Sequence, residues 1–182
     1  MPDAMVLIFI ILAGFLLLIA ADQLQIRKKS ILSRNVRRAG YLLVLASFVL
    51  IALSSTLDTR PSLLFLGTAI FSGILLLWSV FFEFDIERKK HDIPENGLVT
   101  TGSYRFCRHP GFWWFALFSL SLGFLRGISA YFFTILLMNL MNLLLIFIQD
   151  RYIFPKVFQG YDEYRKQVPF LVPRIPKAMR KP

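Results

Sequence analysis

The residues best suited to chemistry lie in a polar segment between two long apolar runs. Residues 97–110 (GLVTTGSYRFCRHP) contain two glycines, an adjacent arginine and histidine, and a proline. Irregular backbone at a membrane edge can line a wet cavity, whereas in contact with lipid its polar groups would stay unsatisfied. Arg108 and His109 could hold an anionic group there. We therefore expect the 97–110 segment to form half of an active site.

The carboxyl end of the last apolar run is the second candidate. Asn139, Asn142, Ile146 and Asp150 follow one another at spacings of three, four and four residues, which places them on one face of a helix. Polar groups at membrane depth either serve function or hydrogen-bond between helices, and for the asparagines both interpretations are equally good. Asp150 opposes the helix dipole, so we expect a cation to compensate it, and Arg151 could do so locally.

The composition indicates an integral membrane protein. The 182 residues are 56% hydrophobic, include 19 phenylalanines and have a mean hydropathy of +0.60, which is too apolar for an ordinary soluble domain. The formal net charge is +10, but the basic residues flank apolar runs, which argues against a nucleic-acid partner. Two histidines are too few for a zinc cluster, and the single Cys107 excludes an intramolecular disulfide. We expect neither nucleic acid nor metal as a ligand.

Five apolar runs are candidate membrane spans. They cover residues 4–21, 40–57, 62–82, 111–125 and 128–148. About 20 helical residues cross a hydrocarbon core of about 30 Å, so the fourth run is short for a full crossing. The first run lacks a preceding basic residue and exceeds the apolar length of a signal peptide, so we expect a mature span. Two short turns predict helical hairpins. The turn at 58–61 would join the second span to the third, and the turn at 126–127 would join the fourth span to the fifth.

The basic residues predict the orientation of these spans. Of the 21 lysines and arginines, 19 lie in 22–39, in 84–111 or from residue 151 onward, and only Arg60 and Arg126 lie elsewhere. The positive-inside rule makes the three basic segments cytoplasmic. The predicted fold is therefore an all-α integral membrane protein with five transmembrane helices, the N-terminus outside and the C-terminus in the cytoplasm.

Three motifs follow one another in the C-terminal half. The first is Gly102-Ser103-Tyr104 with Arg108-His109-Pro110, the second is the acidic end of the last span, and the third is the Tyr-x-x-Tyr segment 161–169 (YDEYRKQVP). Arg-His-Pro alone would be weak, but the ordered combination is specific. From about residue 96 to 173, the chain resembles the superfamily of isoprenylcysteine carboxyl methyltransferases and phospholipid methyltransferases. The resemblance divides the chain into N-terminal membrane spans at 1–95 and a catalytic cofactor-binding region at 96–182.

The resemblance implies a methyltransferase that uses S-adenosylmethionine on a lipophilic or lipid-anchored acceptor, such as an isoprenylcysteine carboxylate or a phospholipid amine. Its cytoplasmic cofactor pocket would be formed by the 96–111 loop and the C-terminal tail. The implied cofactor-binding residues are Leu98, Val99, Gly102, Tyr104, His109, Pro110, Gln149 and Asp150. The implied catalytic residues are Arg108, Asp150 and Arg174. The ammonium of the cofactor suits Asp150, and its carboxylate suits Arg108 or His109.

The chain also departs from the family pattern. The paired glutamates of the family are Gln149-Asp150 here, and Phe112-Trp113-Trp114 replaces the tyrosine and glycine that usually follow Arg-His-Pro. Gln167 stands where the isoprenylcysteine enzymes have a basic residue, which nearby Arg165 or Arg174 would replace.

Two alternatives therefore stay open. One is an NADPH-dependent sterol-type membrane reductase, which shares an Arg-His-Pro region but is usually longer. The other is a non-catalytic membrane protein that retains the fold. Either a bacterial inner membrane or the endoplasmic reticulum fits the sequence, with the acceptor reaching the site from membrane lipid.

Overall fold

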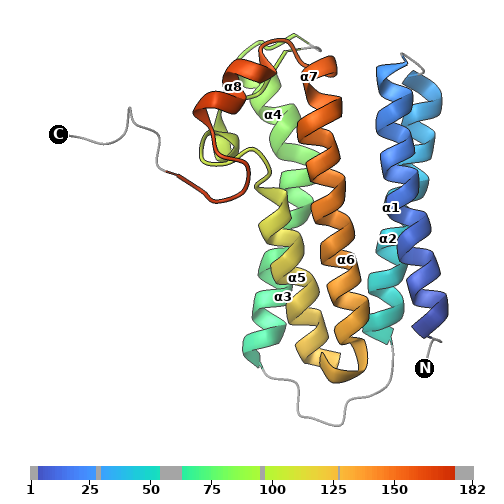
Figure 1. Ribbon diagram of the computed structural model, residues 1–182. Helices are drawn as coiled ribbons and strands as arrows, with labels where there is room; N and C mark the ends of the chain where they lie inside the picture. The colour runs from blue at the N-terminus through green and yellow to red at the C-terminus, as the bar shows by residue number, and fades with distance from the viewer. Residues whose placement is uncertain (1–3, 28–29, 54–62, 95–96, 127, 175–182) are drawn as a thin grey trace.

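Long helices that run side by side make up most of the structure (Figure 1). The computed structural model describes residues 4–27, 30–53, 63–94, 97–126 and 128–174, and these contain helices and no strand. The elements are α1 (Ala4–Ile26), α2 (Ser30–Leu53), α3 (Leu63–Leu77), the π-helical turn η1 (Trp78–Phe82), α4 (Glu83–Lys90), the 3-10 turn η2 (Gly102–Arg105), α5 (Gly111–Arg126), α6 (Ile128–Ile148), the π-helical turn η3 (Gln149–Ile153), α7 (Phe154–Val157) and α8 (Tyr161–Gln167).

Among the described residues, four helical stretches are long and apolar enough to cross a membrane. They are Met5–Ile26, Ile31–Leu53, Leu63–Lys90 and Tyr131–Val157. The predicted all-α membrane fold is confirmed at this level. The fourth predicted span, α5, has 16 residues and packs along α6 as the expected hairpin. At 1.5 Å per residue α5 is about 24 Å long, shorter than a typical hydrocarbon core.

The N-terminal half differs from the prediction in two respects. Residues 22–39, predicted as a basic loop, are mostly helical, since α1 continues to Ile26 and α2 begins at Ser30. Long basic side chains can carry their charge to the membrane surface, so charge alone does not end a helix. The second span was predicted to pair with the third, but α2 packs chiefly along α1 and α3 along α5. The turn predicted at 58–61 lies outside the described residues. The turn predicted at 126–127 includes residue 127, which also lies outside them.

Two glycines allow α1 and α2 to approach closely. A Cβ atom on Gly40 would lie 2.9 Å from the Leu18 side chain and 3.0 Å from the carbonyl oxygen of Gly14. Small residues at a helix crossing are a common way to pack helices in membranes. The same face of α1 carries Leu7, Ile11 and Phe15, which are fully buried in the core shared with α2, α5 and α6.

The polar segments gather at one end of the bundle. In Figure 1 the end of α4, the start of α5, and α7 with α8 all lie at this end, whereas the start of α1 lies at the other. Both π-helical turns belong to the same region: η1 directly precedes Glu83, and η3 contains Asp150. Such turns occur often at functional sites because they redirect the side chains of a helix.

Candidate functional site

A buried ion pair joins the 97–110 segment to the end of α6. Nη2 of Arg108 donates to Oδ2 of Asp150 at 3.1 Å, and Nε lies 2.8 Å from Oδ1. The Nε–H is not aligned with Oδ1, so the second contact is an ion pair and not a hydrogen bond. The two side chains are only 9% and 5% exposed. Asp150 is therefore compensated by a distant arginine and not by its neighbour Arg151.

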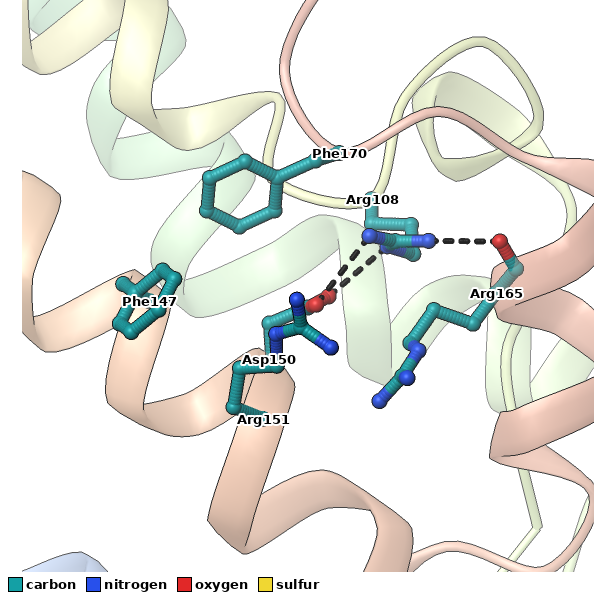
Figure 2. A pocket seen from close by; sticks show the side chains of 6 residues that line it. All are labelled: Arg108, Phe147, Asp150, Arg151, Arg165 and Phe170. Atoms are coloured by element: carbon teal, nitrogen blue, oxygen red, sulfur yellow. Dashed lines mark hydrogen bonds and ion pairs between the residues drawn. The ribbon is translucent and has the colours of Figure 1, made fainter.

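Arg108 also holds the C-terminal tail. Its Nη1 donates to the carbonyl oxygens of Arg165 at 2.8 Å and Val168 at 3.0 Å, which lie at the carboxyl end of α8 (Figure 2 shows the first of these bonds). Carbonyls at a helix end lack partners within the helix and attract cations. The backbone N–H of Arg108 donates to the carbonyl of Pro169 at 3.0 Å. One residue thus fastens the tail to the 97–110 segment and to α6.

Tyr161 and His109 complete the surroundings of Asp150. The Tyr161 hydroxyl donates to Oδ1 at 2.6 Å, and Nε2 of His109 lies 3.5 Å from the same oxygen. Burial, helped by the carboxylate, raises the pKa of Tyr161, which therefore stays protonated as a donor. Burial lowers the pKa of His109 although Asp150 opposes this, so the imidazole is neutral near pH 7. Its ring packs against Phe154 and Phe170.

A pocket of about 280 Å³ opens beside this ion pair (Figure 2). It is lined by Arg108, Phe147, Asp150, Arg151, Arg165 and Phe170. The arginines lie on one side in Figure 2 and the two phenylalanines on the other. The volume is close to the lower limit of small-molecule pockets. A cavity with a buried carboxylate, several guanidiniums and aromatic rings can bind a small charged group together with an apolar one.

The end of the tail crosses the 97–110 segment. The backbone N–H of Arg174 donates to the carbonyl of Phe106 at 3.0 Å, and Nε1 of Trp113 donates to the carbonyl of Leu171 at 2.8 Å. Trp113, a departure from the family pattern, therefore helps to anchor the tail. The side chain of Arg174, predicted as catalytic, is exposed and outside the lining of the pocket.

Gly102 and Tyr104 lie against α4 and α8 and not at the pocket. Glu83, buried on α4, accepts a hydrogen bond from the backbone N–H of Ser103 at 2.7 Å. Gly102 has a φ of +62°, and a Cβ there would lie 2.8 Å from Oε1 of Glu83. The hydroxyl of Tyr164 donates to the carbonyl of Tyr104 at 2.6 Å. Glu83 was missed from the sequence, because an acid directly after an apolar run usually reaches water.

Gln149 contacts the N-terminal hairpin. Its Nε2 donates to Oδ2 of Asp22 at 2.9 Å, and Arg37 forms an ion pair with Oδ1 of Asp22 at 2.9 Å. Asp22 is 1% exposed, so this carboxylate, which the sequence did not single out, is fully buried at the same end of the bundle as Asp150. The side chain of Gln149 is outside the lining of the pocket.

The remaining predicted residues are structural neighbours of the site. Val99 and Pro110 are buried and Leu98 is half-buried in the 97–110 segment, without lining the pocket. Nδ2 of Asn139 donates to Oγ of Ser119 on α5 at 2.9 Å, which favours the packing interpretation of this asparagine. Of the predicted site residues, the structure brings together Arg108, His109 and Asp150.

No family model, curated protein or solved structure matches the chain. Within the described ranges, no three histidine, cysteine or acidic side chains lie close enough together to hold a metal ion.

Proposed function

We propose that the protein is an integral membrane methyltransferase that uses S-adenosylmethionine on a lipophilic or lipid-anchored acceptor. The observation that supports this most is the pocket in which Arg108 and Asp150 lie together at one end of membrane helices. These residues are 42 positions apart in the sequence. They belong to the two motifs that the family resemblance assigns to facing walls of one cofactor pocket.

The side chains at the pocket fit the amino-acid end of the cofactor. A carboxylate has about four acceptor positions, and Oδ2 of Asp150 receives one hydrogen bond, so capacity is left for an ammonium. Nε2 of His109 makes no hydrogen bond among the described residues; it is buried beside Asp150 and does not line the pocket. Phe170 offers apolar surface to an adenine ring.

When bound, S-adenosylmethionine supplies a methyl group on a positively charged sulfur. The residues of the chain would orient this group and exclude water from it, which is enough for an in-line transfer to an acceptor that is already deprotonated. At about 280 Å³, the pocket accommodates the amino-acid portion of the cofactor more readily than the whole molecule.

The proposal includes a topology. Five crossings, with α5 as a short one, place the N-terminus outside and the polar end of the bundle in the cytoplasm, because the basic segments adjoin that end. The cofactor would then reach the pocket from the cytoplasm and the acceptor from the bilayer. A bacterial inner membrane or the endoplasmic reticulum would satisfy this arrangement.

A specific observation favours a second candidate. Both oxygens of Asp150 already contact Arg108, and Oδ1 also accepts from Tyr161. A carboxylate engaged in this way can serve purely to hold the tail. The second candidate is therefore a non-catalytic membrane protein in which Asp150 has a structural role.

Binding of S-adenosylhomocysteine tests the proposal. Isothermal titration of the full chain, purified in detergent, is run on the wild type and on Asp150→Asn, with NADPH as a second ligand. Asp22→Asn is the matched control, because Asp22 is a buried carboxylate at the same end of the bundle that does not line the pocket. Folding of each variant is checked by its thermal unfolding.

We expect the wild type and Asp22→Asn to bind S-adenosylhomocysteine and Asp150→Asn to bind it at least about tenfold more weakly, as for the loss of one charged hydrogen bond. Binding of NADPH instead would identify the reductase alternative. If the wild type binds neither ligand, the non-catalytic candidate is the one that remains.

A further inference from the structure

The pocket carries more positive charge than its carboxylate balances. Arg108, Arg151 and Arg165 line it, and Asp150 is the single acid in its lining. Asp150 is paired with Arg108. Arg165 has a distant contact of 3.9 Å with the exposed Asp162, and no carboxylate in the described part of the chain lies within ion-pair distance of Arg151. Within the described residues, two guanidiniums therefore border the cavity without a close counter-ion.

These two guanidiniums are not needed for the proposed cofactor contacts. The ammonium of the cofactor was assigned to Asp150 and its carboxylate to Arg108 or His109. Figure 2 shows the side chains of Arg151 and Arg165 among those that line the pocket. Arg151 comes from η3 at the end of a membrane helix, and Arg165 comes from α8 in the tail. They come from different elements and line one cavity, which suits a shared anionic group.

An apolar stripe on α6 leads to the same pocket. Leu140, Leu144 and Phe147 are 53%, 44% and 45% exposed, and their spacing of four and three residues puts them on one helical face. Arg151 follows Phe147 by four residues, and both line the pocket. Exposed leucines on a membrane-spanning helix contact lipid chains. The stripe therefore connects the hydrocarbon region with the two guanidiniums.

We propose that this pocket binds an amphiphile with an anionic head group, phosphate or carboxylate. The head group pairs with Arg151 and Arg165, and the hydrocarbon chain lies along Leu140, Leu144 and Phe147. An ammonium head group would instead meet two uncompensated positive charges. The assignment of this amphiphile as the methyl acceptor rests on the proposed function. Binding of the amphiphile does not depend on methyl transfer.

Four probes with the same hydrocarbon chain test the head-group preference. They are oleate, oleoyl lysophosphatidate, mono-oleoylglycerol and oleylamine, titrated calorimetrically against the full chain in a neutral detergent. Inorganic phosphate is titrated alone as the head group without a chain. We expect the two anionic probes to bind at least about tenfold more tightly than the neutral ester, the amine or inorganic phosphate, because a charged hydrogen bond is worth about a factor of ten or more.

Paired arginine variants test the location. Arg151→Gln with Arg165→Gln should weaken both anionic probes at least about tenfold and leave the neutral ester unchanged. The matched control is Arg34→Gln with Arg38→Gln, which removes two exposed arginines from α2 and should leave all affinities unchanged. Arg151 is itself exposed and Arg165 is half-buried, so we expect the first pair to fold.

Three results would overturn the inference: equal affinity for the ester, the amine and the acids, unchanged acid affinity in the Arg151 and Arg165 double variant, or an equal loss in the α2 control. A stronger response to oleate identifies a carboxylate amphiphile, and a stronger response to lysophosphatidate identifies a phosphate lipid. If the acids bind through Arg151 and Arg165 but S-adenosylhomocysteine does not bind at all, the methyltransferase proposal fails and this inference stands.

Discussion

Gln149 and Asp150 are neighbours in the sequence, yet their side chains contact opposite parts of the fold. Gln149 donates to Asp22 on α1, whereas Asp150 is paired with Arg108 of the 97–110 segment. Both residues lie in the π-helical turn η3 that continues α6, where successive side chains point in different directions. The end of α6 therefore links the N-terminal hairpin on one side to the polar segments on the other. The two positions that resemble an acidic pair do not act as a pair here.

The Arg108 and Asp150 ion pair should dominate the stability of the polar end. Arg108→Gln removes the cation from a buried carboxylate and should lower the free energy of unfolding by about 3–5 kcal/mol. Denaturant unfolding in detergent, followed by tryptophan fluorescence, measures this. The exposed pair of Lys166 and Glu163 provides the control, since Glu163→Gln should leave the unfolding midpoint unchanged. Equal effects of both variants would show that burial does not strengthen the first pair.

Tyr161→Phe should have a smaller effect of the same kind. The hydroxyl of Tyr161 donates to Asp150 at 2.6 Å, and its loss should cost about 1.5–3 kcal/mol, the range for a hydrogen bond to a charged group. Tyr152→Phe removes a hydroxyl from an exposed tyrosine of η3 and serves as the control. If the two variants unfold at the same denaturant concentration, the bond from Tyr161 contributes nothing.

The long apolar helices could be predicted from the sequence because burial in lipid leaves backbone groups no other way to be satisfied. The need of Asp150 for a cation followed from the helix dipole, and the resemblance placed Arg108 in the same region. The identity of that cation could not be derived locally, because Arg151 is the nearest cation in the sequence and Arg108 is 42 positions away.

The directions of side chains at the end of α6 could not be predicted. They depend on the π-helical turn η3, for which the sequence 149–153 has no distinctive residue pattern. The roles of Asp22 and Glu83 were missed for a related reason. Each lies at the end of an apolar run, where a charged residue usually reaches water, and only tertiary contacts bury it.

Stability should fall below about pH 6.5 because of His109. Burial holds the pKa of this imidazole below its ordinary value of about 6.5, so between the two pKa values the unfolded chain binds a proton that the folded chain does not. Stability is then complete above pH 6.5 and decreases as the pH falls toward the folded pKa. Thermal unfolding between pH 5 and 8 measures this slope. It should flatten in His109→Gln and persist in His91→Gln, where the histidine is exposed; equal slopes in all three proteins would contradict the assignment to His109.

Gly102→Ala should be more harmful than Gly160→Ala. Both glycines have positive φ values, +62° and +78°, so alanine at either position costs about 1–2 kcal/mol of backbone strain. A Cβ at residue 160 meets open space, whereas at residue 102 it would lie 2.8 Å from Oε1 of Glu83 and disturb the bond from Ser103. We expect about 1–3 kcal/mol of additional destabilisation at residue 102, the range for overpacking. Denaturant midpoints that agree for the two variants would mean that Glu83 moves aside freely.

Gln149→Leu distinguishes a structural from a cofactor-binding role for this residue. In the structure Gln149 donates to the buried Asp22. In the variant, Asp22 would keep only its ion pair with Arg37. We therefore expect the variant to lose about 1.5–3 kcal/mol of unfolding free energy and to bind S-adenosylhomocysteine within about twofold of the wild type. The same substitution in an Asp22→Asn background should cost less, because the partner has already been changed. A variant with unchanged stability and a strongly reduced S-adenosylhomocysteine affinity would instead place Gln149 at the pocket, as the family resemblance implies.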